Sequence, residues 1–515
     1  MIYFMGLDIG TSGLKAGMID TQGNVTASAY WKTRCVSTEP GRMKQNVVEI
    51  LTDTLKIVKE VIQKAQVKSE DVGAVVLDGQ MAGIVGVDEE FASVTGLDSN
   101  LDMQSEKYNS VMHDRFGELL TKITCGSPLN GQKVLKWKRD YPEVYQKVYK
   151  FVTLNGYVAG RMAGLSGEDA FIDHTLLAFF GLESARELNW SEEMCEILDV
   201  EMEKLPTVVP SYKVVGYINK QTADLSGLKQ GTPVLAGAGD QAAGFLGVGI
   251  LEPGQIIDVT GSSTLLSMCV NGFIPDLKNS TIMYIPSVKK DIYYAFTYIN
   301  GGGMSLPWYV ESILGGGAPS DKGLYDELTE LASRLPPGSD GLIFIPYFGG
   351  RQCPFDVRVR GGWLGLNWGH RREHLYRAVL ESIAYDSYLG FQAIMEMFPD
   401  LKAGEILVSG GGSKNSLWNQ IKADVFGVNF RRLEGYEYAI RGCGMIAAYG
   451  CGVYSDLESA ISHMSGSREG NIFFPNKESN RKYARYCEIF KQILSRDLQL
   501  TLYHLLDAST SENCS

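Results

Sequence analysis

The stretch that decides the fold reads Leu235-Ala-Gly-Ala-Gly-Asp-Gln-Ala-Ala-Gly-Phe-Leu-Gly247. The apolar run from Pro233 to Ala236 predicts the end of a buried strand, and a helix is expected after it. Gly237 and Gly239 permit tight backbone geometry between the two elements. Asp240 is therefore expected where a strand ends and a helix begins, which is where ligands collect in α/β folds. Taken alone, an aspartate before a helix most often caps that helix.

The composition bounds the class of protein. With 515 residues the chain is too long for one core, so two or more domains are expected. A net charge of −12 disfavours nucleic-acid binding, and no apolar run is long enough for a membrane helix. The N-terminus is typical of a strand, not of a signal peptide. Nine scattered cysteines without a C-x-x-C pair indicate reduced thiols in a cytoplasmic protein.

The first part of the chain predicts a mixed sheet with helices on its faces, since three antiparallel strands, a helix and another strand follow one another. Apolar residues at helical spacing predict the helix, and alternating or continuous apolar runs predict the strands. The strands are expected at 2–9, 14–19, 25–31 and 72–77, and the helix at 46–65. A mainly helical region is expected from about 105 to 230.

An internal repeat divides the chain. Asp8-Ile-Gly-Thr-Ser-Gly and Asp258-Val-Thr-Gly-Ser-Ser both read as a strand, an aspartate and a turn of small residues, with a second strand after each. Two domains built on the same opening hairpin are expected. The boundaries are placed at 1–247, 248–480 and a C-terminal helix and tail at 481–515, with the helix over 482–506 and disorder at 507–515.

Both of these turns can hold phosphate. Phosphate oxygens need many N–H donors at close range, and glycine and hydroxyl residues provide them at Gly10-Thr-Ser-Gly13 and Gly261-Ser-Ser263. An isolated turn of this kind is usually only a turn, but each of these follows an aspartate at a strand end. Asp8 could hold Mg²⁺, and Lys15 could neutralise charge or be solvated.

Motifs of other protein classes offer alternative interpretations of the chain. The chain has no P-loop string, and Gly237-Ala-Gly239 lacks the third glycine of a dinucleotide fingerprint. His370-Arg-Arg-Glu-His374 matches H-x-x-E-H, which keeps a zinc peptidase as an alternative with bound zinc as its signature. Lys133 and Trp137 lie one helical turn apart, which by spacing alone is a surface lysine over a half-buried indole.

These pieces together resemble the FGGY carbohydrate kinases, with xylulokinase-like and glycerol kinase-like enzymes nearest. The resemblance is collinear from Met1 to about residue 455. Its motifs are Asp8–Gly13, Gly131-Gln-Lys-Val-Leu-Lys-Trp137, Gly239-Asp-Gln-Ala-Ala-Gly244, Gly261–Ser263, Phe348-Gly-Gly-Arg351, the run from Gly361 to Glu381, and Ser409-Gly-Gly-Gly412 with Trp418.

The resemblance implies an actin/Hsp70-like ATPase superfold, with two RNase H-like domains of mixed sheets and helices and an ATP cleft between them. Asp240 would be the general base, Asp8 would position Mg²⁺, and ATP would bind chiefly on the second domain. The implied nucleotide-binding residues are Gly10, Thr11, Ser12, Lys15, Gly261, Ser262, Ser263, Gly302, Gly410, Gly411, Gly412 and Asn415. The implied sugar-binding residues are Gln80, Met81, Ala82, Asp102, Asp240 and Gln241.

The chain departs from the family at the sugar side. Ala82 stands where xylulokinase-like proteins carry histidine, Gln104 replaces an arginine and Asn100 an aromatic residue, while Asp102 is kept. Gln241 is typical of glycerol kinases. Asp173 lies where related kinases often carry polar residues. The expected activity is ATP-dependent phosphorylation of a small carbohydrate such as the ketopentose xylulose, by a homodimer. The alternative from another class is an actin-like nucleotide-driven switch without sugar kinase activity.

Overall fold

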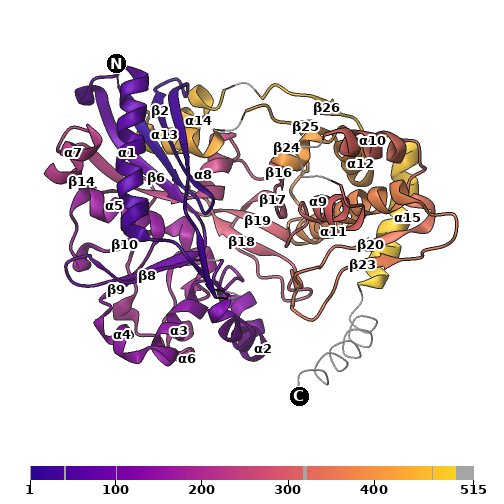
Figure 1. Ribbon diagram of the computed structural model, residues 1–515, viewed down its shortest axis with the longest axis horizontal. Coiled ribbons are helices and arrows are strands. Elements are labelled where there is room, and N and C mark those ends of the chain that lie inside the picture. Colours follow the sequence, from indigo (N-terminus) through magenta and orange to yellow (C-terminus); the bar gives the residue numbers. More distant parts are fainter. Residues whose placement is uncertain are drawn as a thin grey trace.

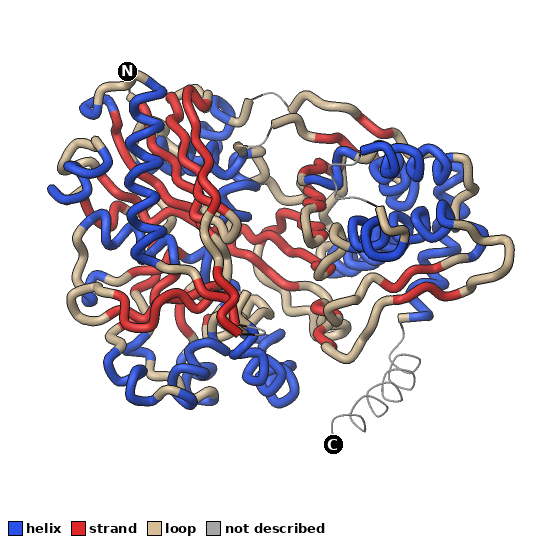
Figure 2. The backbone as a smooth tube through the Cα atoms, in the orientation of Figure 1, coloured by secondary structure: helices blue, strands red, loops and turns tan. Residues whose placement is uncertain are grey.

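The computed structural model describes residues 2–39, 42–99, 101–316, 322–435, 437–466 and 468–494. Two mixed sheets with flanking helices form two lobes that lie side by side (Figures 1 and 2). The C-terminal helix α15 spans Lys477–Ile493. The end of the helix expected over 482–506 and the tail expected over 507–515 fall outside the described residues, as does Asn100.

The first sheet has the strand order β14-β15-β6-β1-β2-β3. The meander predicted at the start of the chain is confirmed, because β1, β2 and β3 pair antiparallel, while β6 and β15 run parallel to β1. The bounds are Tyr3–Ile9 for β1, Gly13–Asp20 for β2, Val25–Lys32 for β3, Val72–Gly79 for β6, Val214–Tyr217 for β14 and Pro233–Gly239 for β15.

The second sheet has the same strand connectivity as the first. Its order is β18-β19-β17-β16-β24-β25-β26, in which β16, β17 and β19 pair antiparallel and β24 and β25 run parallel to β16. The internal repeat predicted from the two aspartate-led hairpins is therefore confirmed. The bounds are Ile256–Thr260 for β16, Thr264–Asn271 for β17, Met283–Pro286 for β18, Ile292–Ile299 for β19, Ile406–Ser409 for β24, Phe430–Arg432 for β25 and Ile472–Phe473 for β26.

Helices cover both faces of each sheet. Asn46 caps the predicted helix α1, since its side chain accepts the amides of Val48 and Glu49, and the apolar stripe of α1 packs on β2 and β3. The main helices of the first lobe are α1 (Val47–Ala65), α2 (Glu106–Ile123), α3 (Gly131–Asp140), α5 (Leu154–Ala163) and α8 (Asp240–Gly247). Those from the rest of the chain are α10 (Lys322–Ser333), α11 (Arg372–Met397), α12 (Ser416–Phe426), α13 (Tyr438–Gly450) and α14 (Leu457–Met464).

The region expected to be mainly helical also contains six short strands among its described residues. They are β9 (Lys150–Thr153), β10 (Phe171–Asp173), β11 (Glu183–Ser184), β12 (Asn189–Trp190), β13 (Thr207–Val209) and β14. Strands of two to four residues are too short to show a period of two, which is why the sequence pattern missed them. In the described residues, no helix has both the length and the apolar character that crossing a membrane requires.

Helix α13 belongs late in the chain but lies on the first sheet. Figure 1 shows α13 and α14 among the early elements of the first lobe, and α13 packs against α8, β1 and β6. The backbones touch through two glycines: a Cβ at Gly247 would lie 1.8 Å from the Tyr438 oxygen, and one at Gly442 would lie 1.9 Å from the Ala243 oxygen. The two halves of the chain are therefore interlocked at this helix pair.

We expect Gly442→Ala to lower the free energy of unfolding by about 1–3 kcal/mol, because the added methyl forces α8 and α13 apart. Chemical denaturation followed by circular dichroism measures the change. Gly244→Ala in α8 is the matched control: its methyl would meet no atom of the described residues within 4 Å beyond its own helix. That variant should gain about 0.5–1 kcal/mol. Equal changes in the free energy of unfolding for the two substitutions would contradict the close contact between α8 and α13.

Candidate active site

Three carboxylates stand at the carboxyl ends of neighbouring parallel strands. Asp8 lies one residue before the end of β1, Asp78 lies one residue before the end of β6, and Asp240 directly follows β15. Asp8 pairs in register with Asp78, and Gly239 pairs with Gly79. The sheet thus brings together residues far apart in sequence at the edge where α/β folds bind ligands.

These three carboxylates would repel one another if all were ionised. Burial, followed by the charge of Asp8, raises the pKa of Asp78 well above its usual value. Burial also raises the pKa of Asp8, which the facing ammonium of Lys15 partly offsets. Burial and the charge of Asp8 raise the pKa of Asp240 to about 7. Carboxylates that share a buried site cannot all ionise unless a cation or a proton joins them.

Asp240 owes its place to the glycines before it. Gly237 has φ +79°, and a Cβ there would lie 1.7 Å from the Leu77 oxygen. A Cβ at Gly239 would lie 2.0 Å from the Met81 sulfur. Gly239 takes the N-cap position of α8, so Asp240 is the first helical residue and not the cap that its local sequence suggests. Its Oδ1 accepts the amide of Gln241 at 2.7 Å.

A buried hydrogen-bond chain supports this strand end. The Gly239 amide donates to Thr175 Oγ1 at 2.8 Å, and Thr175 donates from its hydroxyl and its amide to Asp173 Oδ1. Burial raises the pKa of Asp173 to about 7. Asp173, at a position where related kinases often carry polar residues, is therefore linked through Thr175 to the backbone that carries Asp240.

The first turn links Asp8 to the loop after β6. The Gly10 amide donates to the Gly13 oxygen at 3.1 Å and closes the turn, in which Ser12 is exposed. Thr11 Oγ1 donates to Gln80 Oε1 at 2.6 Å, and Gln45 Nε2 donates to the Thr11 oxygen at 3.0 Å. Gln80 Nε2 has no hydrogen-bond partner within the described chain, so a donor near the turn is left for a ligand.

The second turn and the glycine loop lie together at the end of β16. The Gly261 amide donates to the Ser263 oxygen at 2.9 Å, and the Met304 amide donates to the Ser262 oxygen. A Cβ at Gly302 would lie 2.7 Å from Thr264 Oγ1, so that glycine packs closely behind the turn. A Cβ at Gly410 would lie 2.4 Å from the Thr260 oxygen. Neither Gly302 nor Gly410 therefore has room for a side chain.

The remaining residues predicted for the nucleotide follow in the loop after β24. Gly410, Gly411 and Gly412 run into Asn415, which caps α12 by accepting the Trp418 amide at 3.1 Å. The Asn415 amide group donates to Tyr376 at 3.1 Å, so this side chain is held by α11. A groove of about 470 Å³ lies beside this loop, between α10 and α12.

The residues predicted for the sugar line the loop after β6 and the start of α2. Met81 and Ala82 are buried, and Asn130 holds their loop through bonds to the Gly83 amide at 2.8 Å and the Met81 oxygen at 3.4 Å. Asp102 is also buried and accepts the Gln104 amide at 2.9 Å. Gln241, which follows Asp240, has its Oε1 buried without a partner in the described residues.

Two buried lysines stand near Asp102. Lys136 forms a buried ion pair with Asp98, and Lys133 donates to the Leu129 oxygen at 2.5 Å. Burial lowers the pKa of Lys133 to about 8. The reading of Lys133 as a surface lysine, which spacing alone favoured, is wrong.

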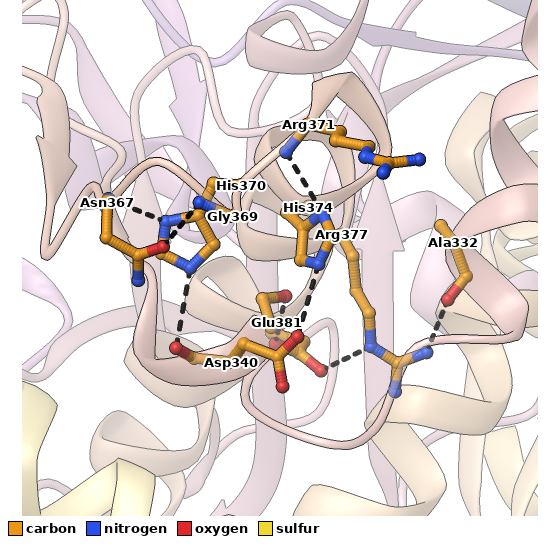
Figure 3. A network of polar contacts seen from close by, with 10 residues as sticks. Ala332, Asp340, Asn367, Gly369, His370, Arg371, His374, Arg377 and Glu381 are labelled. Carbon is orange, nitrogen blue, oxygen red and sulfur yellow. Dashed lines mark hydrogen bonds and ion pairs between the residues drawn. The ribbon is translucent and has the colours of Figure 1, made fainter.

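The two histidines of the H-x-x-E-H string serve the entry to α11 (Figure 3). His370 Nδ1 accepts the Asn367 amide at 3.0 Å, and His374 Nδ1 accepts the Arg371 amide at 3.1 Å. Both Nε2 atoms face Asp340. In the described part of the chain, no group of three or more histidine, cysteine or acidic residues has metal-binding geometry. The string therefore belongs to the local structure of a helix start.

Sequence reasoning missed Asp78, Cys443 and Lys422. Cys443 on α13 donates from its Sγ to Asp78 Oδ2 at 3.2 Å, and Lys422 on α12 binds Asp258 Oδ1 at 2.7 Å. Asp78 carried a signal, since it follows a predicted buried strand as Asp8 does. The partners of Cys443 and Lys422 carried none, because they arise only when distant segments pack.

Comparison with known proteins agrees with this arrangement. The family models described as "FGGY family of carbohydrate kinases", N-terminal and C-terminal domain, match residues 3–247 and 261–451. A xylulose kinase of Bacillus subtilis is 28% identical over 509 residues, spanning 98% of this chain and 99% of that protein. A gluconokinase of Bacillus licheniformis is 26% identical over 507 residues, spanning 96% of each.

Solved structures show the same fold. A ligand-bound xylulose kinase from Lactobacillus acidophilus superposes with a TM-score of 0.84 at 23% identity, covering 96% of this chain and 99% of the other. The two lobes have the actin/Hsp70-like ATPase superfold. More particularly, the chain belongs to the FGGY family of carbohydrate kinases. It is a kinase that uses ATP and has an alcohol group as acceptor, so the resemblance seen in the sequence is confirmed.

The raised pKa of Asp240 predicts how stability depends on pH. The folded protein holds this proton more tightly than the unfolded chain, in which the aspartate pKa is 3.8. The contribution is therefore full below about pH 3.8 and is lost as the pH rises through about 7. Urea unfolding in the presence of EDTA measures the free energy of unfolding of Asp240→Asn and of the parent protein. The difference in favour of the variant should be larger at pH 8 than at pH 5. Glu90→Gln, at an exposed position, should show the same difference at both pH values.

Proposed function

We propose that this chain transfers the γ-phosphoryl group of ATP to one hydroxyl of a small carbohydrate, with Asp240 as the general base. The observation that carries the proposal is the position of Asp240, at the end of β15 beside Asp8 and Asp78. A ketopentose such as xylulose is the first substrate to test, because close relatives are named xylulose kinase. The cleft between the lobes, a homodimer and a cytoplasmic location without nucleic-acid or membrane partners remain predictions.

The chemistry follows from the groups at the sheet edge. Asp240 would accept the proton of the sugar hydroxyl as that oxygen attacks the γ-phosphorus in line. A pKa of about 7 suits a base that works near neutral pH. The amides and hydroxyls of Gly10, Thr11, Ser12 and of 261–263 would stabilise the charge of the transferring phosphoryl group, with Lys15 beside them. Gly302, Gly410, Gly411, Gly412 and Asn415 would hold the rest of the nucleotide.

Mg²⁺ fits the first carboxylate. Asp8 offers carboxylate oxygens, which are the ligand type that this cation prefers. It lies at a buried site where burial raises its pKa. Mg²⁺ bound there would neutralise phosphate charge and align the phosphates for in-line transfer. Asp8 would hold it, directly or through water, on the side of the first turn.

The sugar would be read by the loop after β6 and the start of α2. Gln80, Met81, Ala82, Asp102 and Gln241 supply one apolar surface and several polar groups for hydroxyls. Ala82 has no hydrogen-bonding side chain where xylulokinase-like proteins offer a histidine, and Gln104 offers an amide in place of an arginine. Unpaired polar groups discriminate strongly between hydroxyl patterns, so these positions would decide the sugar.

Asp240→Asn should lower sugar phosphorylation by about 10²–10⁴-fold while ATP still binds, because the amide cannot accept the proton. A coupled assay of ADP formation measures turnover, and calorimetry with ATP checks binding. Turnover close to that of the parent protein would contradict the role of the base.

The acceptor should emerge from a panel of pentuloses, hexuloses, pentitols, glycerol, erythritol and gluconate. ADP formation by the parent protein should rise at least tenfold with one of them over the rate without sugar. Turnover that no acceptor stimulates would favour the nucleotide-driven switch instead. The panel is repeated with Gln104→Arg, which should change the order of acceptors if this position reads the sugar.

A further inference from the structure

Asp78 has no role in the mechanism proposed above, although it lies in the middle of the site. Its side chain is fully buried. It pairs in parallel register with Asp8, so the two carboxyl groups are neighbours on adjacent strands. Two ionised carboxylates are both acceptors, so only a proton or a cation can join them.

The strand geometry directs both side chains to the same face. Alternate residues of a strand share a face, so Asp8 points with Gly6, and Asp78 points with Val76. A Cβ at Gly6 would lie 3.2 Å from the Cys443 Cβ, which identifies this face as the one covered by α13. Both carboxyl groups therefore point to the side of the sheet on which α13 and α8 pack.

Cys443 fixes the orientation of Asp78. Its Sγ donates to Oδ2 at 3.2 Å, whereas Oδ1 has no hydrogen-bond partner among the described residues. An outer hydrogen bond of this kind orients a ligating carboxylate and leaves its other oxygen for the metal. A buried carboxylate oxygen without a donor needs an explanation, and a bound cation is one.

The second half of the chain provides an internal comparison. Asp258 on β16 lies three residues before the turn glycine Gly261, whereas Asp8 lies two residues before Gly10, so the two aspartates point to opposite faces of their sheets. Asp258 binds the buried ammonium of Lys422 at 2.7 Å. A single buried aspartate near this sheet end is thus paired with a lysine, whereas the first half carries two buried carboxyl groups side by side.

We propose that Asp78 and Asp8 together form a divalent-cation site, with Asp78 Oδ1 as a direct ligand. The inference rests on the proposed function, because the cation in turnover is the Mg²⁺ that serves ATP. It extends that function, since a site with two carboxylates binds the cation before the nucleotide arrives. One or two carboxylates are the protein ligands that Mg²⁺ usually takes.

Titration of the nucleotide-free protein with Mn²⁺, with free Mn²⁺ followed by electron paramagnetic resonance, tests the site. The parent protein should bind one Mn²⁺ that Mg²⁺ displaces. Asp78→Asn and Asp8→Asn should each weaken binding by about 10-fold or more, as expected for the loss of a carboxylate ligand. Glu183→Gln, a buried carboxyl group that accepts the amides of Cys125 and Leu182, is the matched control and should keep the affinity of the parent protein.

The folding of the variants is checked directly. Asp78→Asn removes a repulsion between carboxylates, so the metal-free variant should melt no lower than the parent protein. Asp78→Ser provides a second substitution with the same expected loss of Mn²⁺ affinity. Cys443→Ser keeps the donor to Oδ2 and should retain binding within about threefold, a smaller loss than removal of such a partner brings.

The outcomes separate this inference from the proposed function. Mn²⁺ affinity that survives both Asp78 substitutions overturns the inference, even where Asp8→Asn abolishes binding. Asp240→Asn should keep Mn²⁺ affinity and lose sugar phosphorylation, so failure of the base assignment appears in a different measurement. A parent protein that binds no Mn²⁺ without nucleotide also overturns the inference, while sugar phosphorylation can still be observed.

Discussion

The contact between α8 and α13 is the constraint on which the site depends. Gly247 and Gly442 allow the two backbones to touch, and any larger side chain would separate them. Asp240 begins α8, and Cys443 on α13 donates to Asp78. The same crossing therefore sets the position of Asp240, the proposed base, and the orientation of Asp78. Because α13 comes from the late part of the chain, the site is complete only when both halves have folded.

The packing that builds the site also makes it electrostatically unfavourable. Asp8, Asp78 and Asp240 all have pKa values raised by burial, and the charges of Asp8 and Asp240 add to the shift at Asp78. An apolar residue in place of Asp78 would avoid the cost of burying a carboxyl group. Perturbed carboxyls in a cluster are typical of functional sites, where stability is given up for reactivity.

The repeat, the two turns and most long helices could be predicted, because each is written in a local pattern. The place of Asp240 between a strand and a helix was also predicted locally, whereas its role as a base came from the resemblance to the kinase family. The relation of Asp78 to Asp8 could not be predicted, because it depends on β6 pairing beside β1 across the helix α1. Lys422 was missed for the same reason: it meets Asp258 only through the packing of α12 on the second sheet. The six short strands could not be predicted, because two to four residues are too few to show the alternation of apolar residues typical of a strand.

The two halves have the same strand connectivity but differ in how their buried aspartates are compensated. A bare carboxylate beneath Gly261–Ser263 would repel a phosphate bound by that turn, and the buried ammonium of Lys422 removes the repulsion. In the first half Lys15 faces Asp8, and the proposed metal ion would offset the second carboxyl group, Asp78. The duplicated fold thus buries one aspartate with an internal ammonium in its second half and two adjacent aspartates in its first half.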